Sequence, residues 1–317
     1  MSFESKNLRS FPRLTVRATR VAALALLGLA GFPATGHAID LTADLTPDTT
    51  RYLSDPSFLP LEGQIYSETV YSHTDQHQVL EIIGGPTQAR FAASGDHYSQ
   101  TFDYGISDRF SILGSATYSD TKNTASFQFG PPSSESTHEF ENPTFAATYR
   151  ALEQIESPVS LDVRASYSPA TSNNLSQSGQ VALFVNRETK FLTIQGEFGA
   201  TYIDSYTGNQ AEDHNGYWNY FAGMRTQMRL TDSFAINSGV IYSQNTDISE
   251  RGFLTYHDKF DGNWSPYAAL VYSVVPNHVD VSFEYDRDFI GDDRRDGVLE
   301  FTGNHENLYA IHLRLLF

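Results

Sequence analysis

Charged side chains that alternate with apolar ones supply the richest chemistry in this 317-residue sequence. Successive side chains on a strand point to opposite faces, so the charges gather on one polar face. If that face lines a lumen, they form a transverse field that orients or selects solutes. They can equally be structural pairs, which cost less to bury together than alone. The candidates are Asp103, Arg150, Asp162, Arg164, Glu197, Arg225, Arg229, Asp280, Glu284, Asp286, His312 and Arg314.

Two of these charges, Glu197 and Arg225, should lie roughly across from each other on neighbouring strands, by counting positions from the turns. Acidic residues collect on the penultimate strand, three strands away from Arg225 and Arg229. This separation of signs favours a field across the lumen, whereas a Glu197–Arg225 pair would neutralise part of it.

A hydrolytic pair is the main enzymatic alternative. His97 and Ser99 stand two residues apart on one polar face, a spacing similar to that of the outer-membrane phospholipase. Nucleophilic catalysis also needs a group that orients the histidine, and the sequence assigns none. Two polar residues at the rim of a lumen are the simpler interpretation. We therefore predict no catalytic residue, with a lipid-modifying activity kept as the alternative.

Metal and cofactor sites are not predicted. His73 and His77 have the chemistry of metal ligands, but no third ligand is evident beside them. The chain has no Cys, so thiolate sites and disulfides are impossible. No glycine-rich phosphate loop, metalloprotease motif or dinucleotide fingerprint occurs.

The elements that must position these side chains are strands of period two. Between residues 97 and 119, Tyr98, Phe102 and Tyr104 share one face, and a short turn at 107–108 leads into a second alternating strand. The same unit recurs until twelve strands fill residues 63–317. We predict an all-β, antiparallel, up-and-down transmembrane barrel of twelve strands.

Connections between the strands alternate between short and long, with short turns on one side only. Outer-membrane barrels have short periplasmic turns and longer extracellular loops, whereas a soluble β-sandwich has no reason to separate them. A mean hydropathy of −0.36 excludes a protein of membrane-spanning helices. The long loops are expected at about 74–96, 120–141, 168–178, 204–216, 244–263 and 288–305.

Aromatic residues support the same fold. Tyrosines end the strands that run toward the long loops, and phenylalanines stand at the opposite end of the apolar face. Two aromatic rings around an aliphatic band are typical of side chains at two lipid–water interfaces. The members are Tyr118, Tyr167, Tyr202, Tyr242 and Tyr285 on one side, and Phe110, Phe234 and Phe317 on the other.

The first 38 residues have the order of a secretion signal. A basic segment precedes an apolar run at residues 21–32, and small residues precede a cleavage position after Ala38. Residues 39–62 hold several turn signals and little periodicity, so they are either a periplasmic lead-in or a short plug. The mature barrel then spans residues 63–317.

The last strand resembles the recognition segment of bacterial outer-membrane barrels. Tyr309, Leu313, Leu315 and Phe317 are apolar at alternate positions, and the chain stops on an aromatic residue. The resemblance implies that the barrel-assembly machinery reads this strand and inserts the protein into the bacterial outer membrane.

Two segments are similar to a subfamily. Residues 103–112 look like a strand–turn–strand of the phenol-degradation-pathway outer-membrane transporter group, and residues 55–63 look like the lead-in of such barrels. This likeness implies small-molecule passage and transfers no site residue.

Charge limits the partners. Without the first 38 residues, which hold five basic residues and one acidic residue, the net charge changes from −17 to −21. Such a surface repels phosphate backbones, so nucleic acid is not a partner. Membrane lipids, lipopolysaccharide and a small solute are the expected partners, and the oligomeric state stays open.

The predicted function is a channel for small solutes, including hydrophobic or aromatic ones. The alternatives are a phospholipase-like enzyme and a structural or adhesive barrel that acts through acidic extracellular loops.

Overall fold

The computed structural model describes residues 52–317, except for 129, 156, 172–175, 206–212, 252–254 and 297. The predicted secretion signal, residues 1–38, and residues 39–51 lie outside this part. Among the described residues, no helix is long and apolar enough to cross a membrane.

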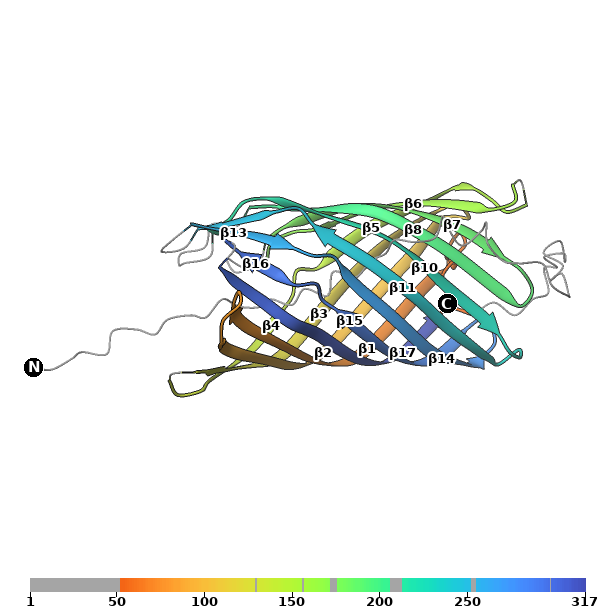
Figure 1. Cartoon of the computed structure of the whole chain (residues 1–317). Helices are drawn as coiled ribbons and strands as arrows, with labels where there is room; N and C mark the ends of the chain where they lie inside the picture. Colours follow the sequence, from red (N-terminus) through yellow and green to blue (C-terminus); the bar gives the residue numbers. More distant parts are fainter. Residues whose placement is uncertain are drawn as a thin grey trace, which may run out of the picture.

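Twelve antiparallel strands close into a barrel, which confirms the predicted fold (Figure 1). They are β1 (Ile65–Ile82), β2 (Thr87–Ser107), β3 (Phe110–Phe127), β5 (Thr144–Leu152), β6 (Ser160–Ser168), β7 (Ser178–Glu188), β8 (Leu192–Ile203), β10 (Tyr217–Arg229), β11 (Phe234–Asn245), β14 (Asn263–Val275), β15 (Val279–Phe289) and β17 (Leu299–Leu316). Each pairs with the next along the chain, and β17 pairs with β1 from Tyr66↔Leu316 to Ile82↔Leu299. Closure leaves no free edge around the wall, as the interior of a lipid bilayer requires.

Several predicted long loops are instead extensions of the wall. β1 continues to Ile82 and β2 begins at Thr87, so the expected loop at 74–96 is a hairpin with a turn at 83–86. Beyond the bilayer both faces of a strand meet water, so pairing continues while the apolar alternation that identifies a membrane strand stops. Five short strands extend the rim in this way. They are β4 (Ser133–Phe140), β9 (Asp213–His214), β12 (Ile248–Arg251), β13 (Thr255–Phe260) and β16 (Asp293–Arg295).

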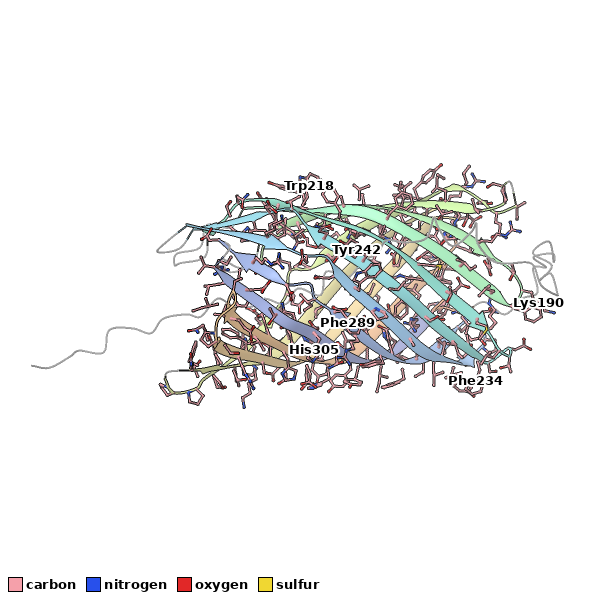
Figure 2. All side chains as sticks on the ribbon, viewed as in Figure 1. Lys190, Trp218, Phe234, Tyr242, Phe289 and His305 are labelled. Carbon is pink, nitrogen blue, oxygen red and sulfur yellow. The ribbon has the colours of Figure 1, made fainter. Side chains whose placement is uncertain are left out.

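The outer face carries the two aromatic rings. At the end with the extensions, rings pair across neighbouring strands with centroids 5.0 to 5.3 Å apart, in Tyr71–Tyr98, Tyr118–Phe140, Tyr202–Trp218, Tyr242–Trp264 and Tyr285–Tyr309. At the short-turn end Phe234 and Tyr272 lie 4.9 Å apart. Figure 2 shows Phe234 at the end opposite to Trp218. The exposed apolar side chains between the rings fit the hydrocarbon layer of a membrane.

The short-turn end should face the periplasm, and single cysteines test this because the chain has none of its own. Pro86 lies in the exposed β1–β2 turn and Pro276 in the exposed β14–β15 turn. On intact cells, a membrane-impermeant maleimide should label Pro86→Cys and leave Pro276→Cys unlabelled until the cells are lysed. The reverse pattern would show that the barrel is inserted the other way round.

The carboxyl terminus completes the closing seam, where the backbone N–H of Phe317 donates to the carbonyl oxygen of Ile65 at 2.9 Å and the reverse bond is 3.0 Å. The Phe317 side chain is exposed on the outer surface.

Phe317→Ser keeps the backbone bonds but removes the aromatic end of the predicted assembly signal. We expect less heat-modifiable barrel in the outer membrane with export unchanged. Phe191→Ser, another exposed Phe at the short-turn end, is the control.

Candidate functional site

The lumen wall joins the predicted charges mainly into ion pairs. Arg150 binds both carboxylate oxygens of Asp162, at 2.8 and 3.0 Å. Nε of Arg225 donates to Glu197 at 2.6 Å. The strand count places the two residues roughly across from each other, and in the observed register they are diagonal neighbours, since Arg225 is opposite Gln195 and Glu197 opposite Gly223. Such pairs offset the cost of holding charge away from bulk water. The wall is therefore locally neutral at these positions.

A second cluster spans the closing seam. Glu68 accepts hydrogen bonds from Nε of Arg314 at 2.8 Å and from Nδ1 of His312 at 2.9 Å. Nε2 of His312 lies 3.6 Å from Glu284. Glu68 is absent from the predicted set, although its spacing from Tyr66 and Val70 places all three on the lumen face. Period-two spacing along β1 could have placed Glu68 on the lumen face. The outward residues Ser67 and Thr69 are polar as well, so this strand lacks the apolar–polar alternation that marks the other strands.

The segment 52–60, which precedes β1, lies inside the barrel at the short-turn end. Its Asp55 binds Nη2 of Arg229 at 2.7 Å and the Thr193 hydroxyl at 2.8 Å. Arg150 donates to the carbonyl oxygen of Ser57 at 2.7 Å. The backbone N–H of Leu53 donates to Asp280 at 2.6 Å. Three of the predicted lumen charges, Arg150, Arg229 and Asp280, therefore hold this segment.

Amide side chains add further contacts to the same segment. Gln195 donates to the carbonyl oxygen of Pro56 at 2.6 Å, and Asn237 donates to that of Ser54 at 3.1 Å. The Tyr52 hydroxyl donates to the carbonyl oxygen of Thr231 at 2.7 Å. Since the chain here makes no ladder with another strand, these side chains satisfy its backbone groups instead.

Apolar residues also face the lumen, and the sequence reasoning missed them. Ala182, Phe221 and Ile241 form a buried cluster with Phe184 packed against it. Phe221 alternates with Asn219 and Gly223, so its place on the polar face could have been read from the sequence. The ring of Phe221 lies against Gly199, where an added Cβ would come within 2.6 Å of it.

The alternative hydrolytic pair, His97 and Ser99, is not assembled. Nδ1 of His97 lies 2.9 Å from the Ser119 hydroxyl, and Nε2 lies 3.2 Å from Thr74. The Ser99 hydroxyl instead bonds to Thr117 at 2.7 Å. Within the described residues, no group of three or more His, Asp and Glu side chains is arranged to hold a metal ion.

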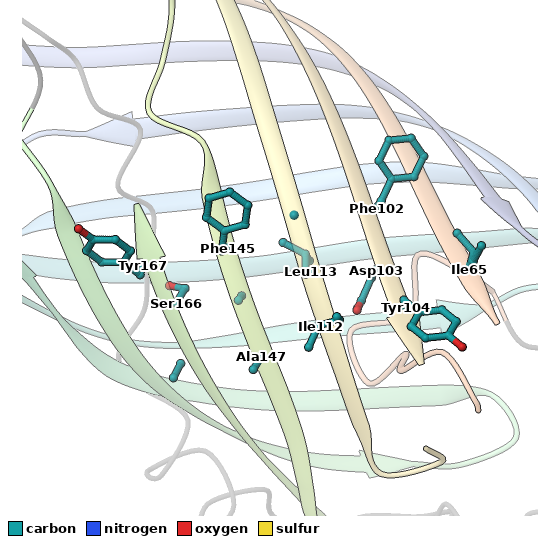
Figure 3. Close-up of a pocket in the computed structure, with 13 residues that line it drawn as sticks. Ile65, Phe102, Asp103, Tyr104, Ile112, Leu113, Phe145, Ala147, Ser166 and Tyr167 are labelled. Atoms are coloured by element: carbon teal, nitrogen blue, oxygen red, sulfur yellow. The ribbon is translucent and has the colours of Figure 1, made fainter. Parts of the chain in front are cut away.

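A groove of about 880 Å³ crosses the outer face of β2, β3, β5 and β6. Its lining includes Phe102, Gly114, Phe145, Ala147 and Tyr167, on the strands that Figure 3 shows in close-up. Phe102 and Phe145 flank Gly114 in the strand register, so small residues lie between larger rings. The groove belongs to the exposed apolar surface and not to the charged lumen.

The extended rim is acidic. Nε of Arg294 donates to Glu300 at 2.7 Å. Burial, followed by the nearby carboxylates of Glu300 and Asp261, raises the pKa of Asp292. Carboxylates that crowd one another in this way favour protonation or a bound cation.

No protein-family profile and no curated protein sequence matches this chain. Among solved structures, it is similar to the COG4313 outer membrane channel from Pseudomonas putida F1. The TM-score is 0.57 at 11% identity, over 82% of this chain and 97% of that one. It is also similar to the transport unit of the autotransporter AIDA-I from Escherichia coli. There the TM-score is 0.54 at 8% identity, over 78% of this chain and 89% of that one. The likeness shows a shared fold, that of a bacterial outer-membrane β-barrel.

Arg229 should be the most important lumen charge for stability, because it binds Asp55 and Glu188 at 2.7 Å each and is almost fully buried. Arg229→Gln leaves two carboxylates without their cation. We expect the free energy of unfolding in urea, in lipid vesicles, to fall by about 3–5 kcal/mol. Arg294→Gln, which breaks an exposed pair, should change it by less than about 1 kcal/mol. Equal effects of the two substitutions would contradict the assigned role.

Proposed function

We propose that this protein is a passive outer-membrane channel for small solutes, including hydrophobic or aromatic ones. The observation that supports this most directly is a closed twelve-stranded wall whose lumen carries both paired charges and aromatic side chains. Eight-stranded barrels are filled by side chains, and barrels of 16 to 18 strands hold wide aqueous pores. Twelve strands leave a narrow passage in which wall side chains contact the solute.

The segment 52–60 is proposed to act as a plug that narrows the short-turn end. Polar contacts hold it at its first residue and through its middle, at Tyr52, Asp55 and Ser57. Hydrogen bonds, one buried ion pair and two apolar contacts, Tyr52 against Ala235 and Val271 and Phe58 against Tyr66, hold it without a strand ladder that would make it part of the wall. Displacing the segment breaks these side-chain contacts but no strand pairing of the wall.

The proposal does not include catalysis. His97 and Ser99 bond to different residues, so these two side chains do not form a nucleophile and its base. The similarity in fold to a channel and to a transport unit agrees with a role in passage across the membrane.

Lipopolysaccharide is the proposed partner of the outer surface. A polar row crosses β1 to β4 through His73, Asp96, Asp120 and His138, and each His lies 2.9 Å from its neighbouring Asp. The row lies two residues beyond Tyr71 and Tyr98 of the aromatic ring, at the next outward-facing position, where lipid headgroups replace hydrocarbon. The barrel-assembly machinery remains the proposed partner of β17 during insertion.

Asp55→Asn tests the plug. The substitution keeps the shape of the side chain while removing the charge that Arg229 and Thr193 hold. In planar bilayers we expect a larger mean conductance, or more frequent open events, than in the wild type. Deleting residues 52–60 should increase conductance further. Glu139→Gln, on the exposed extension β4, is the control and should leave conductance unchanged. Identical traces for wild type, Asp55→Asn and the deletion would contradict a plug.

A further inference from the structure

One lumen cation stands apart from the others. Nε of Arg164 donates to the Thr148 hydroxyl at 3.0 Å, and within the described part of the chain its guanidinium has no carboxylate within ion-pair distance. The other arginines on the lumen face, Arg150, Arg225, Arg229 and Arg314, each have a carboxylate partner at 2.6 to 2.8 Å. Arg164 therefore keeps both of its terminal amino groups available to a ligand.

The charges around Arg164 do not remove this availability. Those that act on it most are Asp103, Arg225, Glu197 and Asp162. Arg225 and Glu197 neutralise each other, and Asp162 is bound by Arg150. Asp103 is left. Its carboxylate forms no ion pair with Arg164, and one of its oxygens has no hydrogen-bond partner among the described residues.

Aromatic rings accompany the arginines along the same half of the wall. The guanidinium carbon of Arg164 lies 5.2 Å from the centre of the Phe184 ring. That of Arg225 lies 5.8 Å from the Tyr267 ring. We call Arg164, Phe184, Arg225 and Tyr267 the arginine–aromatic belt. Phe184 also packs on the apolar cluster that contains Phe221, so the belt has an apolar floor next to its free cation.

From this arrangement we infer that the belt is a binding site for small aromatic carboxylates on their way through the lumen. The planar guanidinium of Arg164 matches a carboxylate with two parallel hydrogen bonds. The aromatic body of the ligand would lie against Phe184 and the face of a guanidinium, where stacking is favourable. A short aliphatic acid would lose the second contact, and an aromatic amine would be repelled by the free cation. This inference deepens the proposed channel function. It rests on that function only in that the bound ligand is taken to cross the lumen, since binding itself does not require passage.

The probes are sodium benzoate, sodium acetate and benzylammonium chloride, and binding is measured by calorimetry on the full mature protein in detergent micelles. We expect benzoate to bind more tightly than acetate and benzylammonium. Arg164→Gln should weaken benzoate binding roughly tenfold or more, because a charge-assisted pair is lost. Phe184→Leu should weaken benzoate but not acetate. Asp103→Asn should strengthen benzoate, since it removes the remaining opposing charge. Lys122→Gln removes a cation from the exposed extension of β3 and is the matched control, with no change expected.

Each variant is first checked for a heat-modifiable barrel, so that misfolding is not read as lost binding. Benzoate binding that is equal in wild type and Arg164→Gln would overturn the inference, as would equal binding of benzoate and benzylammonium to the wild type. Failure of the channel proposal looks different. In that case planar bilayers with wild type or Asp55→Asn would show no current, while benzoate would still bind and Arg164→Gln would still weaken it.

Discussion

The closed ladder of backbone hydrogen bonds is the constraint on which the rest of this structure depends. Hydrocarbon offers no partner to a backbone N–H or C=O group, so a strand in a bilayer must be paired on both edges. The last strand supplies the final edge, since β17 pairs with β1 along nearly its whole length. Every other feature follows from a wall that has only two faces. One face meets lipid and must be apolar, and the other meets whatever fills the lumen.

Because the wall has one lipid face and one lumen face, charged side chains within the hydrocarbon layer must lie on the lumen face. A twelve-stranded lumen is too narrow to hydrate every charged side chain as bulk water would, so the wall pairs them, as in Arg150–Asp162 and Arg225–Glu197. The segment 52–60 takes part in the same pairing, because Asp55 gives Arg229 its deepest partner. Ion pairs and hydrogen bonds thus hold much of the interior together where a soluble domain would use one apolar core, and the apolar clusters inside the barrel are small. Substitution of a lumen charge consequently affects both the wall and the segment within it.

The sequence predicts the parts of this structure that lipid enforces. Alternation marks the strands only while one face meets hydrocarbon, which is why the wall and the aromatic rings are predictable and the extensions β4, β12 and β13 are not. The polar face follows from the same alternation, but its pairing depends on the strand register. A count from the turns places Glu197 roughly across from Arg225, close enough for the two side chains to meet. It gives no means of seeing that Asp55 reaches Arg229 across 174 residues, since that contact depends on how an unpaired segment enters the barrel.

Selectivity in such a lumen must come from the exceptions to pairing. A guanidinium that already binds a carboxylate presents little net charge to a passing solute, and its donors are occupied. Binding a solute to a paired arginine also costs more free energy than binding it to a free one, because the carboxylate that loses its cation stays unsatisfied. The number of charges on the polar face is therefore a poor guide to what the lumen recognises. The informative quantity is the charge left after each pair is removed. Here that leaves Arg164 and Asp103, the one nearby carboxylate without an ion-pair partner in the described part of the wall.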